Sequence, residues 1–346
     1  MRARVVAKEQ PWLANWELLR TQKLVDGVGS DCSVIKEQRW DRQGAELIAS
    51  LDFKPDPLPA PCFENGDPLT GRLQMYLDSA AAYTHALQWA VTGDERHARK
   101  TAEILDAWAT TVTNLPGDGM ELTVGYTAYR FCNAAEIIRH TWTGWPPASI
   151  ERFSRFMTNL AVPKIINFKP HYNGNWDASM IDSLMAIGIF TDRRDLFNRA
   201  VDYYRLGKGN GALTNYLRVS GQCQESTRDQ VHVQVGLGHL ANACEQAWNQ
   251  GVDLWGEAGN RLLRGYEYTA AYNLGNEVPC DGKISGKYRG RFYPIYEMVY
   301  RHYHGRKNLP MPFTRKVIEQ QRSHGGEGLS LDPNSWGTLA FAVDQL

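Results

Sequence analysis

The chain has 346 residues, with 38 Lys and Arg residues against 38 Asp and Glu residues, so its formal net charge is zero. Its hydrophobic content of 43% and its 11 tryptophans predict a large packed core and exclude a disordered chain. The balanced charge argues against a nucleic-acid-binding protein, which needs a surplus of Lys and Arg. The absence of any run of 18 apolar residues predicts no membrane span.

Neither the first residues nor the cysteines indicate clearly in which cellular compartment the protein resides. The first residues, MRARVVAKEQPW, are polar and resemble the middle of a helix rather than a signal peptide, so a trimmed leader is one interpretation. The six cysteines contain no CxxC pair, which argues against a zinc site and leaves either disulfides or buried free thiols. They are Cys32, Cys62, Cys132, Cys223, Cys244 and Cys280.

Apolar residues recur at helical spacing in pairs of segments that are separated by short turns. The first pair is 79–91 and 95–112, with Thr92-Gly93-Asp94 between them. Three further pairs are predicted: 127–141 with 148–168, 178–190 with 193–206, and 228–249 with 256–272. No alternating strand pattern is longer than four residues. Repeated hairpins predict an all-α array with one inner and one outer helix each, either closed into a toroid or stacked into a solenoid.

Three linkers between these hairpins are long, polar and rich in Gly, Asn, Arg and Tyr. They are 169–177 (KPHYNGNWD), 207–230 (GKGNGALTNYLRVSGQCQESTRDQ) and 275–297 (GNEVPCDGKISGKYRGRFYPIYE). Long loops on a rigid scaffold usually carry function. We therefore expect the site in these loops, although solvated connectors are the alternative.

The second linker ends in a candidate base. Ser226 and Asp229 have the spacing of a capping box, which predicts a helix that begins near Thr227. Arg228 and His232 would then lie one turn apart on the same helix face. A nearby guanidinium favours neutral imidazole, which suits a general base. The alternative is an ordinary core or surface histidine.

In the first linker, Asn175 precedes an apolar helix that Trp176 opens. This position predicts an N-cap, or a residue just before it. The functional alternative is that the Asn175 amide and the free backbone N–H groups face an anion.

The third linker begins a basic, tyrosine-rich run that is a candidate site for polyanions. Tyr288 lies in a Gly-flanked loop, which a core role explains poorly. The basic residues of the run are Lys283, Lys287, Arg289, Arg291, Arg301, Arg306 and Lys307, against Asp281 and Glu297.

β-Elimination from a uronic acid fits this set of groups. The reaction needs donors that neutralise the carboxylate, for which Asn175 and Arg228 are candidates. It also needs a base at the adjacent proton, for which His232 is the candidate, and a tyrosine that protonates the leaving oxygen. It requires no metal or cofactor.

With these residues the chain resembles the alginate-lyase-like polysaccharide lyases built on an (α/α) toroid, closest to the branch of glucuronan and polymannuronate lyases. The resemblance covers roughly residues 75–305. The matching stretches are Ala90 to Arg96, Gly174-Asn175-Trp176, Gln222 to His232, Asn249 to Leu254, Glu267 to Gly275, and Arg289 to Tyr303. Better-known alginate lyases of this fold carry Asn-Asn-His where this chain has Asn-Gly-Asn-Trp.

The resemblance implies an all-α fold, an (α/α)6–7 toroid that forms an incomplete barrel, as one domain over residues 1–346. It implies that Asn175 neutralises the uronate with Arg228, that His232 is the base, and that Tyr288 is the acid, with Tyr293 and Tyr296 as alternatives. The expected substrate-binding residues are Trp176, Gln224, Glu225, Lys287, Arg289, Arg291, Tyr293 and Tyr296.

We expect a secreted or periplasmic monomer that acts on an acidic polysaccharide, without metal or cofactor and without nucleic-acid or membrane partners. Two other functions stay open. A glycoside hydrolase on the same toroid would depend on Glu225 or Asp229 as carboxylates. A non-catalytic carbohydrate-binding scaffold would bind polymer without forming product.

Overall fold

The computed structural model describes residues 1–22, 48–63 and 71–346. Within these residues the regular structure is helical, and β-pairing is limited to the isolated bridges Cys62–Gly71 and Leu217–Cys223. The helices are α1 (Arg2–Val6), α2 (Trp12–Thr21), α5 (Arg72–Thr92), α6 (Glu95–Thr111), α7 (Met120–Thr141), α8 (Pro147–Phe156), α9 (Val162–Ile165), α10 (Gly174–Phe190), α11 (Arg194–Leu206), α12 (Leu213–Tyr216), α13 (Gln230–Asn249), α14 (Glu257–Asn273), α15 (Tyr296–Tyr300), α16 (Pro312–Arg322) and α17 (Gly337–Phe341).

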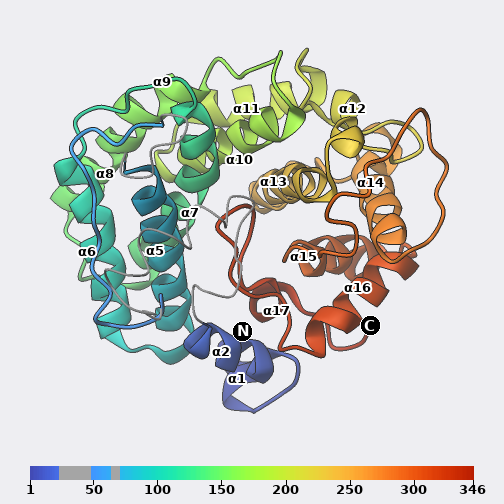
Figure 1. The fold of residues 1–346 in the computed structure, drawn as a ribbon. Coiled ribbons are helices and arrows are strands. Elements are labelled where there is room, and N and C mark those ends of the chain that lie inside the picture. Colours follow the sequence, from blue (N-terminus) through green and yellow to red (C-terminus); the bar gives the residue numbers. More distant parts are fainter. Residues whose placement is uncertain (23–47, 64–70) are drawn as a thin grey trace.

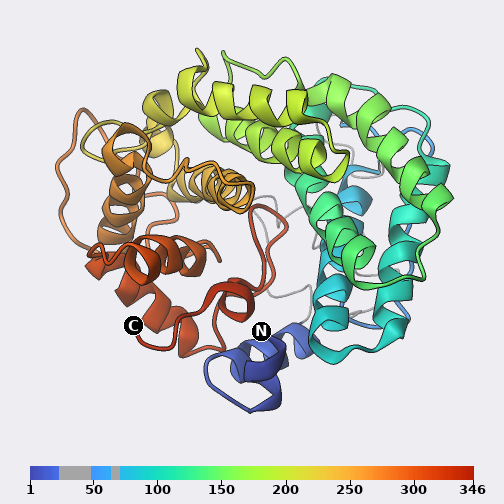
Figure 2. The same cartoon turned by 180° about the vertical axis from the view of Figure 1, so that it is seen from behind.

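The helices form a ring of antiparallel hairpins, so the predicted (α/α) toroid is confirmed (Figure 1). Helices α5, α7, α10 and α13 line the inside, and α6, α8, α11 and α14 lie outside them. Figure 2 shows the same ring from behind, with α2 beside α17, where the two ends of the chain meet.

The inner helices are buried on most sides and include buried polar residues, whereas the outer helices bury a single apolar stripe. Nearly every residue of α10 is buried, while α11 buries one stripe that includes Leu196, Ala200 and Tyr204. A helix that is hydrophobic on all sides must have neighbours on all sides, and a striped helix needs only one covered face. The sequence pattern therefore assigns each helix to its layer.

The predicted helix boundaries differ from the observed ones at three places. Helix α5 begins at Arg72 and α7 at Met120, each about two turns before the predicted start. The predicted helix 148–168 is divided by a π-helical segment, Met157–Ala161, and its last α-helical residue is Ile165. Pro163 is the second residue of α9, just beyond this π-helical segment, and its missing N–H disturbs the regular hydrogen-bond ladder.

A buried carboxylate joins two inner helices. Asp182 of α10 accepts hydrogen bonds from His239 Nδ1 (2.8 Å), Asn242 Nδ2 (2.9 Å) and Gln246 Nε2 (2.6 Å), all on α13. Burial raises the pKa of Asp182, and the hydrogen bonds from His239 and the two amides oppose that shift. This cluster sets the relative positions of α10 and α13.

The segment between α16 and α17 closes the middle of the ring. Arg130 of α7 donates hydrogen bonds to the carbonyl oxygens of Ser330, Leu331 and Asp332, and the Tyr129 hydroxyl donates to the Asp332 carbonyl. Figure 1 shows this segment crossing the space inside the inner helices. We call residues 327–336 the central segment.

We expect Asp182→Ala to lower the free energy of unfolding by about 3–5 kcal/mol, because three buried donors lose their acceptor. Urea denaturation followed by circular dichroism measures the change. The control is Asp195→Ala, which removes an exposed ion pair with Arg193 on α11 and is expected to cost less than about 1 kcal/mol. Equal losses in both variants would contradict the structural role of Asp182.

A second prediction concerns pH. Burial and the neighbouring Glu297 carboxylate raise the pKa of Glu327 to about 8. The pKa of an unfolded Glu is near 4.5, so the folded state binds the proton of Glu327 more strongly than the unfolded state does. The protonated Glu327 therefore makes its full contribution to the free energy of unfolding below pH 4.5. The contribution then falls by up to about 1.4 kcal/mol per pH unit as the pH rises to 8.

We expect Glu327→Gln to match the wild-type melting temperature near pH 5 and to exceed it at pH 8.5. Differential scanning fluorimetry across this range measures the difference. Glu319→Gln, which alters an exposed ion pair with Arg315, provides the control and is expected to follow the wild-type profile. A difference between Glu327→Gln and wild type that does not change with pH would contradict the raised pKa.

Candidate active site

The first polar linker ends at the N-terminus of α10, where the backbone is packed tightly. Asn173 is the N-cap residue and Gly174 the first helical residue, so Asn175 is the second residue of the helix rather than its cap. Only glycine fits at position 174, because a Cβ there would lie 2.3 Å from Tyr216 Cδ2 and 2.6 Å from the Asn210 carbonyl oxygen. The expectation that Asn175 is an N-cap is therefore wrong by two positions.

The free backbone N–H groups at this helix terminus bind acceptors from the second linker. The Asn175 N–H donates to Glu225 Oε1 (2.8 Å), and the Gly174 N–H donates to Gln224 Oε1 (3.1 Å). A carboxylate is stabilised at a helix N-terminus by these donors and by the helix dipole. The anion at the start of α10 is thus the buried carboxylate of the chain itself.

Glu225 also binds the candidate arginine. Arg228 Nη1 donates to Glu225 Oε2 (3.1 Å), so the two carboxylate oxygens hold α10 and Arg228 respectively. Burial raises the pKa of Glu225, while the Asn175 hydrogen bond and the nearby charges of His232 and Arg228 oppose the shift. Arg228 keeps an exposed guanidinium that is anchored on one side only.

The third linker is hydrogen-bonded to the second through backbone groups. The Ser285 N–H donates to the Ser226 carbonyl (2.8 Å), and the Gln230 N–H donates to the Lys287 carbonyl (3.0 Å). Gln230 Nε2 also donates to the Ser285 carbonyl (3.0 Å). Since Gln230 is the first residue of α13, these bonds place the loop of Tyr288 beside the helix that carries His232.

His232 is held by Asp229 rather than influenced by an arginine on its own helix. Asp229 is the N-cap of α13 and accepts from the His232 N–H (2.8 Å), while both carboxylate oxygens contact His232 Nδ1 at 2.8 and 2.9 Å. Among the described residues, Nε2 of this ring has no hydrogen-bond partner, and 18% of the side chain is exposed. A carboxylate on Nδ1 orients the imidazole and directs the Nε2 lone pair outward.

This geometry corrects the prediction for the start of the helix. The helix begins at Gln230, after a short 3-10 helix at Gln224–Thr227, and Asp229 rather than Ser226 is the cap. Arg228 therefore precedes the helix and does not share a face with His232. Burial opposes ionisation of Asp229, but the hydrogen bonds from the His232 side chain and backbone lower its pKa.

Asn175 has a buried tyrosine as its side-chain partner. Its Nδ2 donates to the Tyr126 hydroxyl (2.8 Å), and its Oδ1 is buried without a partner among the described residues. Burial raises the pKa of Tyr126 well above its usual value, so this hydroxyl keeps its proton. The Asn175 side chain is therefore fixed at the level of the site, with an unused acceptor.

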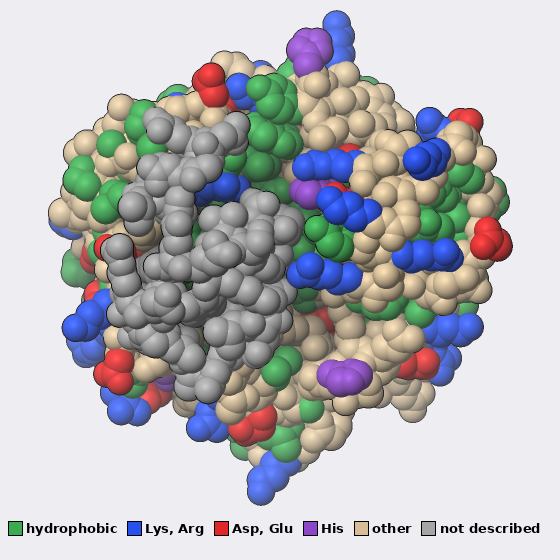
Figure 3. Space-filling view, in the orientation of Figure 1, with side chains coloured by type: hydrophobic (Ala, Val, Ile, Leu, Met, Phe, Trp, Pro, Cys, Tyr) green, Lys and Arg blue, Asp and Glu red, His purple; other side chains and the backbone are tan. Residues whose placement is uncertain are grey.

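Cationic and aromatic side chains surround this group. Lys287, Tyr288, Arg289 and Arg228 are exposed, and Trp176 is half-buried with its ring 4.5 Å from that of Tyr172. Figure 3 shows Lys and Arg side chains gathered around a histidine in the region where Figure 1 places α13 and α14. The face therefore suits a negatively charged ligand.

Comparison with known proteins relates this arrangement to one family. The sequence profile described as alginate lyase matches residues 64–279, which is more than half of the chain. The chain belongs to the alginate lyase family. No curated protein matches this chain significantly.

Solved structures with the same fold are distant in sequence. Alginate lyase A1-III from Sphingomonas species A1 has 15% identity and a TM-score of 0.56, with 87% of this chain and 88% of that chain covered. A variant of alginate lyase A1-III in complex with a tetrasaccharide has 16% identity and a TM-score of 0.62, with the same coverage. An alginate lyase from Bacteroides ovatus has 16% identity and a TM-score of 0.51, with 78% and 80% covered.

Two of the predicted substrate-binding residues of this alginate lyase family member lie in the core. Tyr296 is fully buried and its hydroxyl donates to Gln234 Oε1 (2.9 Å). Tyr293 is 4% exposed and donates to Asp332 Oδ2 (3.1 Å) of the central segment. The expectation that they contact sugar is therefore wrong, because the fold covers the end of the third linker with other elements.

The other predicted residues lie in or beside the site, with different degrees of freedom. Gln224 is half-buried and Glu225 is fully engaged, so Glu225 supports the site instead of contacting substrate. Arg289 donates to the carbonyl oxygens of Tyr272 and Asn276, which fixes its guanidinium beside α14. Arg291 is half-buried, with its guanidinium 5.6 Å from the Tyr293 ring.

Neither Tyr126 nor Tyr172 is among the site residues predicted from the sequence. Tyr126 lies in an apolar helix, where its pattern is that of any core aromatic residue, and only the contact with Asn175 reveals its position. Tyr172 could have been identified from the sequence, since it is an aromatic residue in the same polar linker as Trp176, and the structure shows it exposed beside that residue.

The described residues contain no group of three or more His, Cys, Asp and Glu side chains arranged to hold a metal ion. Cys132, Cys223, Cys244 and Cys280 are free thiols, whereas Cys32 lies outside the described residues. None of the helices in the described ranges could cross a membrane.

We expect Glu225→Ala to lower the free energy of unfolding by about 2–3 kcal/mol and to release Arg228, because a buried N–H and a guanidinium lose their acceptor. Urea denaturation tests the stability. Glu257→Gln is the matched control, since it weakens a partly exposed pair with Arg205 between outer helices. A Glu225→Ala variant as stable as this control would contradict the role assigned to the carboxylate.

Proposed function

We propose that this chain is a polysaccharide lyase that cleaves a β-1,4-linked polyuronate, glucuronan or polymannuronate, by metal-independent β-elimination. Membership of the alginate lyase family supports polysaccharide lyase activity. The single observation that carries the mechanism is the Asp229–His232 pair, which orients the imidazole through Nδ1 and leaves Nε2 without a hydrogen-bond partner among the described residues.

The base acts on the proton at C5 of the uronate. His232 Nε2 takes this proton, the C5–H electrons form the C4–C5 double bond, and the bond between C4 and the glycosidic oxygen breaks. Asp229 stabilises the imidazolium that forms, since its carboxylate already accepts from Nδ1. The product carries an unsaturated uronate at its new non-reducing end.

The carboxylate of the substrate must be neutralised so that charge can move onto it. The exposed guanidinium of Arg228 supplies a cation, and the Asn175 amide supplies a polar group at the same level. Rotation of this amide by 180° lets the Tyr126 hydroxyl donate to Oδ1 and leaves Nδ2 as an unused donor, in a side chain that is only 1% exposed. Tyr126 therefore serves as a positioning residue.

The leaving oxygen needs a proton. Tyr288 is 44% exposed and adopts a positive φ of 62° between Gly286 and Gly290, on the loop that Gln230 holds against α13. Its hydroxyl is the proposed acid. Trp176 and Tyr172, whose rings are tilted by 39° to each other, offer aromatic faces for neighbouring sugar rings.

The two carboxylates on which a hydrolase would depend, Glu225 and Asp229, are both bound to other groups of the protein. Both oxygens of Glu225 are used by Asn175 and Arg228, and both oxygens of Asp229 contact His232. Hydrolysis needs two carboxyl groups that face the glycosidic bond. These contacts favour elimination over hydrolysis.

The test is absorbance near 235 nm during incubation with glucuronan, polymannuronate, polyguluronate and a neutral glucan. We expect an increase with glucuronan or polymannuronate, and none with the neutral glucan, which has no carboxylate at C5. Reducing ends without ultraviolet absorbance would indicate a hydrolase, and binding without product would indicate a scaffold.

We expect His232→Ala to lower the elimination rate at least about 100-fold, because the oriented base is lost, while the circular dichroism spectrum stays unchanged. Asp229→Asn is expected to lower it about 10- to 100-fold by loosening the ring. His324→Ala is the control, since His324 is exposed in the turn that follows α16. Activity of His232→Ala within tenfold of wild type would show that another group is the base.

A further inference from the structure

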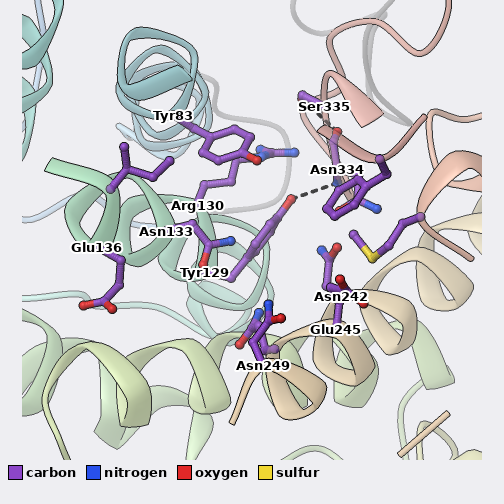
Figure 4. A pocket seen from close by; sticks show the side chains of 14 residues that line it. Tyr83, Tyr129, Arg130, Asn133, Glu136, Asn242, Glu245, Asn249, Asn334 and Ser335 are labelled. Carbon is purple, nitrogen blue, oxygen red and sulfur yellow. Dashed lines mark hydrogen bonds between the residues drawn. The ribbon is translucent and has the colours of Figure 1, made fainter. Parts of the chain in front are cut away.

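A cavity lies inside the ring, away from the candidate active site. It has a volume of about 290 Å³ and is bounded by α5, α7, α13, α15, α17 and the central segment. Figure 4 shows side chains from facing helices directed toward this space, among them Asn133 of α7 and Asn242 of α13.

This cavity opens at the opposite end of the inner helices. His232 is in the first turn of α13, whereas Asn242 and Gln246 are in its second half, about 15–20 Å further along the axis at 1.5 Å per residue. On α7, Tyr126 contacts the active-site Asn175, and Asn133 lies two turns further on. The central segment crosses the ring between the two ends.

The charged side chains that line the cavity are bound to protein partners. Arg130 donates to three backbone carbonyls of the central segment. Glu245 receives two hydrogen bonds from Arg306, at 2.7 and 2.8 Å. Glu136 faces His140 and Arg139 at 3.4 and 3.7 Å. Each charged lining residue therefore already has an ionic or backbone partner, while Arg130 Nε and Glu136 Oε1 are left without a hydrogen bond among the described residues.

The neutral polar groups of the cavity include hydrogen-bonding atoms without partners. Asn242 and Gln246 each donate their amide nitrogen to Asp182, which fixes their orientation, and Gln246 Oε1 is left buried without a partner. Within the described part of the chain, Asn133 and the Tyr83 hydroxyl have no hydrogen-bond partner. Asn133 and Tyr83 are half-buried, so their polar groups are open to a ligand or water, whereas the buried Gln246 Oε1 is costly unless one of these satisfies it.

We propose that this cavity binds one neutral monosaccharide unit, a pyranose with free hydroxyl groups. Hydroxyl groups donate and accept, which matches amide oxygens of fixed orientation together with the amide of Asn133 and the phenol of Tyr83. Phe341, Met298 and Ile137 provide apolar wall for the C–H faces of a sugar ring. This cavity is separate from the candidate active site around His232, and the proposal does not depend on the function proposed for that site.

Isothermal titration calorimetry with the methyl α-pyranosides of glucose, mannose and galactose tests this proposal, with glucuronate and galacturonate as charged counterparts. We expect at least one neutral sugar to bind, and Asn133→Leu, which replaces the amide with an apolar side chain of similar shape, to weaken that binding at least tenfold. Tyr83→Phe, which removes only one hydroxyl, is expected to weaken it about three- to tenfold without affecting the fold.

Two controls separate this cavity from the candidate active site. Asn159→Ala removes an exposed amide from the outer layer, and Arg228→Ala alters the candidate active site; both are expected to leave neutral-sugar binding unchanged. Asn133→Leu is expected to leave polyuronate cleavage within twofold of wild type. The proposal is overturned if no neutral sugar binds, if binding survives Asn133→Leu, or if Arg228→Ala abolishes it.

Discussion

The carboxylate of Glu225 is the interaction on which the candidate site depends. One oxygen satisfies the N-terminus of α10 and the other anchors Arg228, so a single buried side chain connects two linkers that are 50 residues apart in sequence. An unpaired carboxylate in this position would be strongly disfavoured, and the helix N-terminus and the guanidinium together compensate for its burial. Because Asn175 follows Gly174 at that terminus, the tether also positions the amide assigned to the substrate.

Asp229 likewise makes two separate contacts with one carboxylate, at the N-terminus of α13. As the N-cap of α13 it satisfies the His232 N–H, and as the partner of Nδ1 it orients the ring three residues later. Local helix geometry thus imposes the direction of the imidazole. His232, the proposed base, is positioned by the N-terminus of its own helix. The hydrogen bonds of Gln230 hold the loop of Tyr288 beside that terminus.

The ring architecture gives the molecule two different ends. Inner helices that run in parallel present their N-termini at one end, where donors and cations suit an acidic polymer. At the other end the charged groups are paired with protein partners, and neutral amides remain. The central segment keeps the two ends apart because Arg130 and Tyr129 bind its backbone near the middle of α7.

The sequence alone indicated the helical hairpins, each with one inner and one outer helix, and the three polar linkers, because periodicity and turn residues act over one or two helical turns. It also indicated Asn175, Arg228, His232 and Tyr288 as the reacting set. Tertiary structure decided that Asp229 rather than Arg228 holds the ring of His232, that Tyr296 is buried, and that Tyr126 supports Asn175. These outcomes depend on contacts that ring closure creates, some between residues 200 positions apart, and no local pattern encodes which partners meet there.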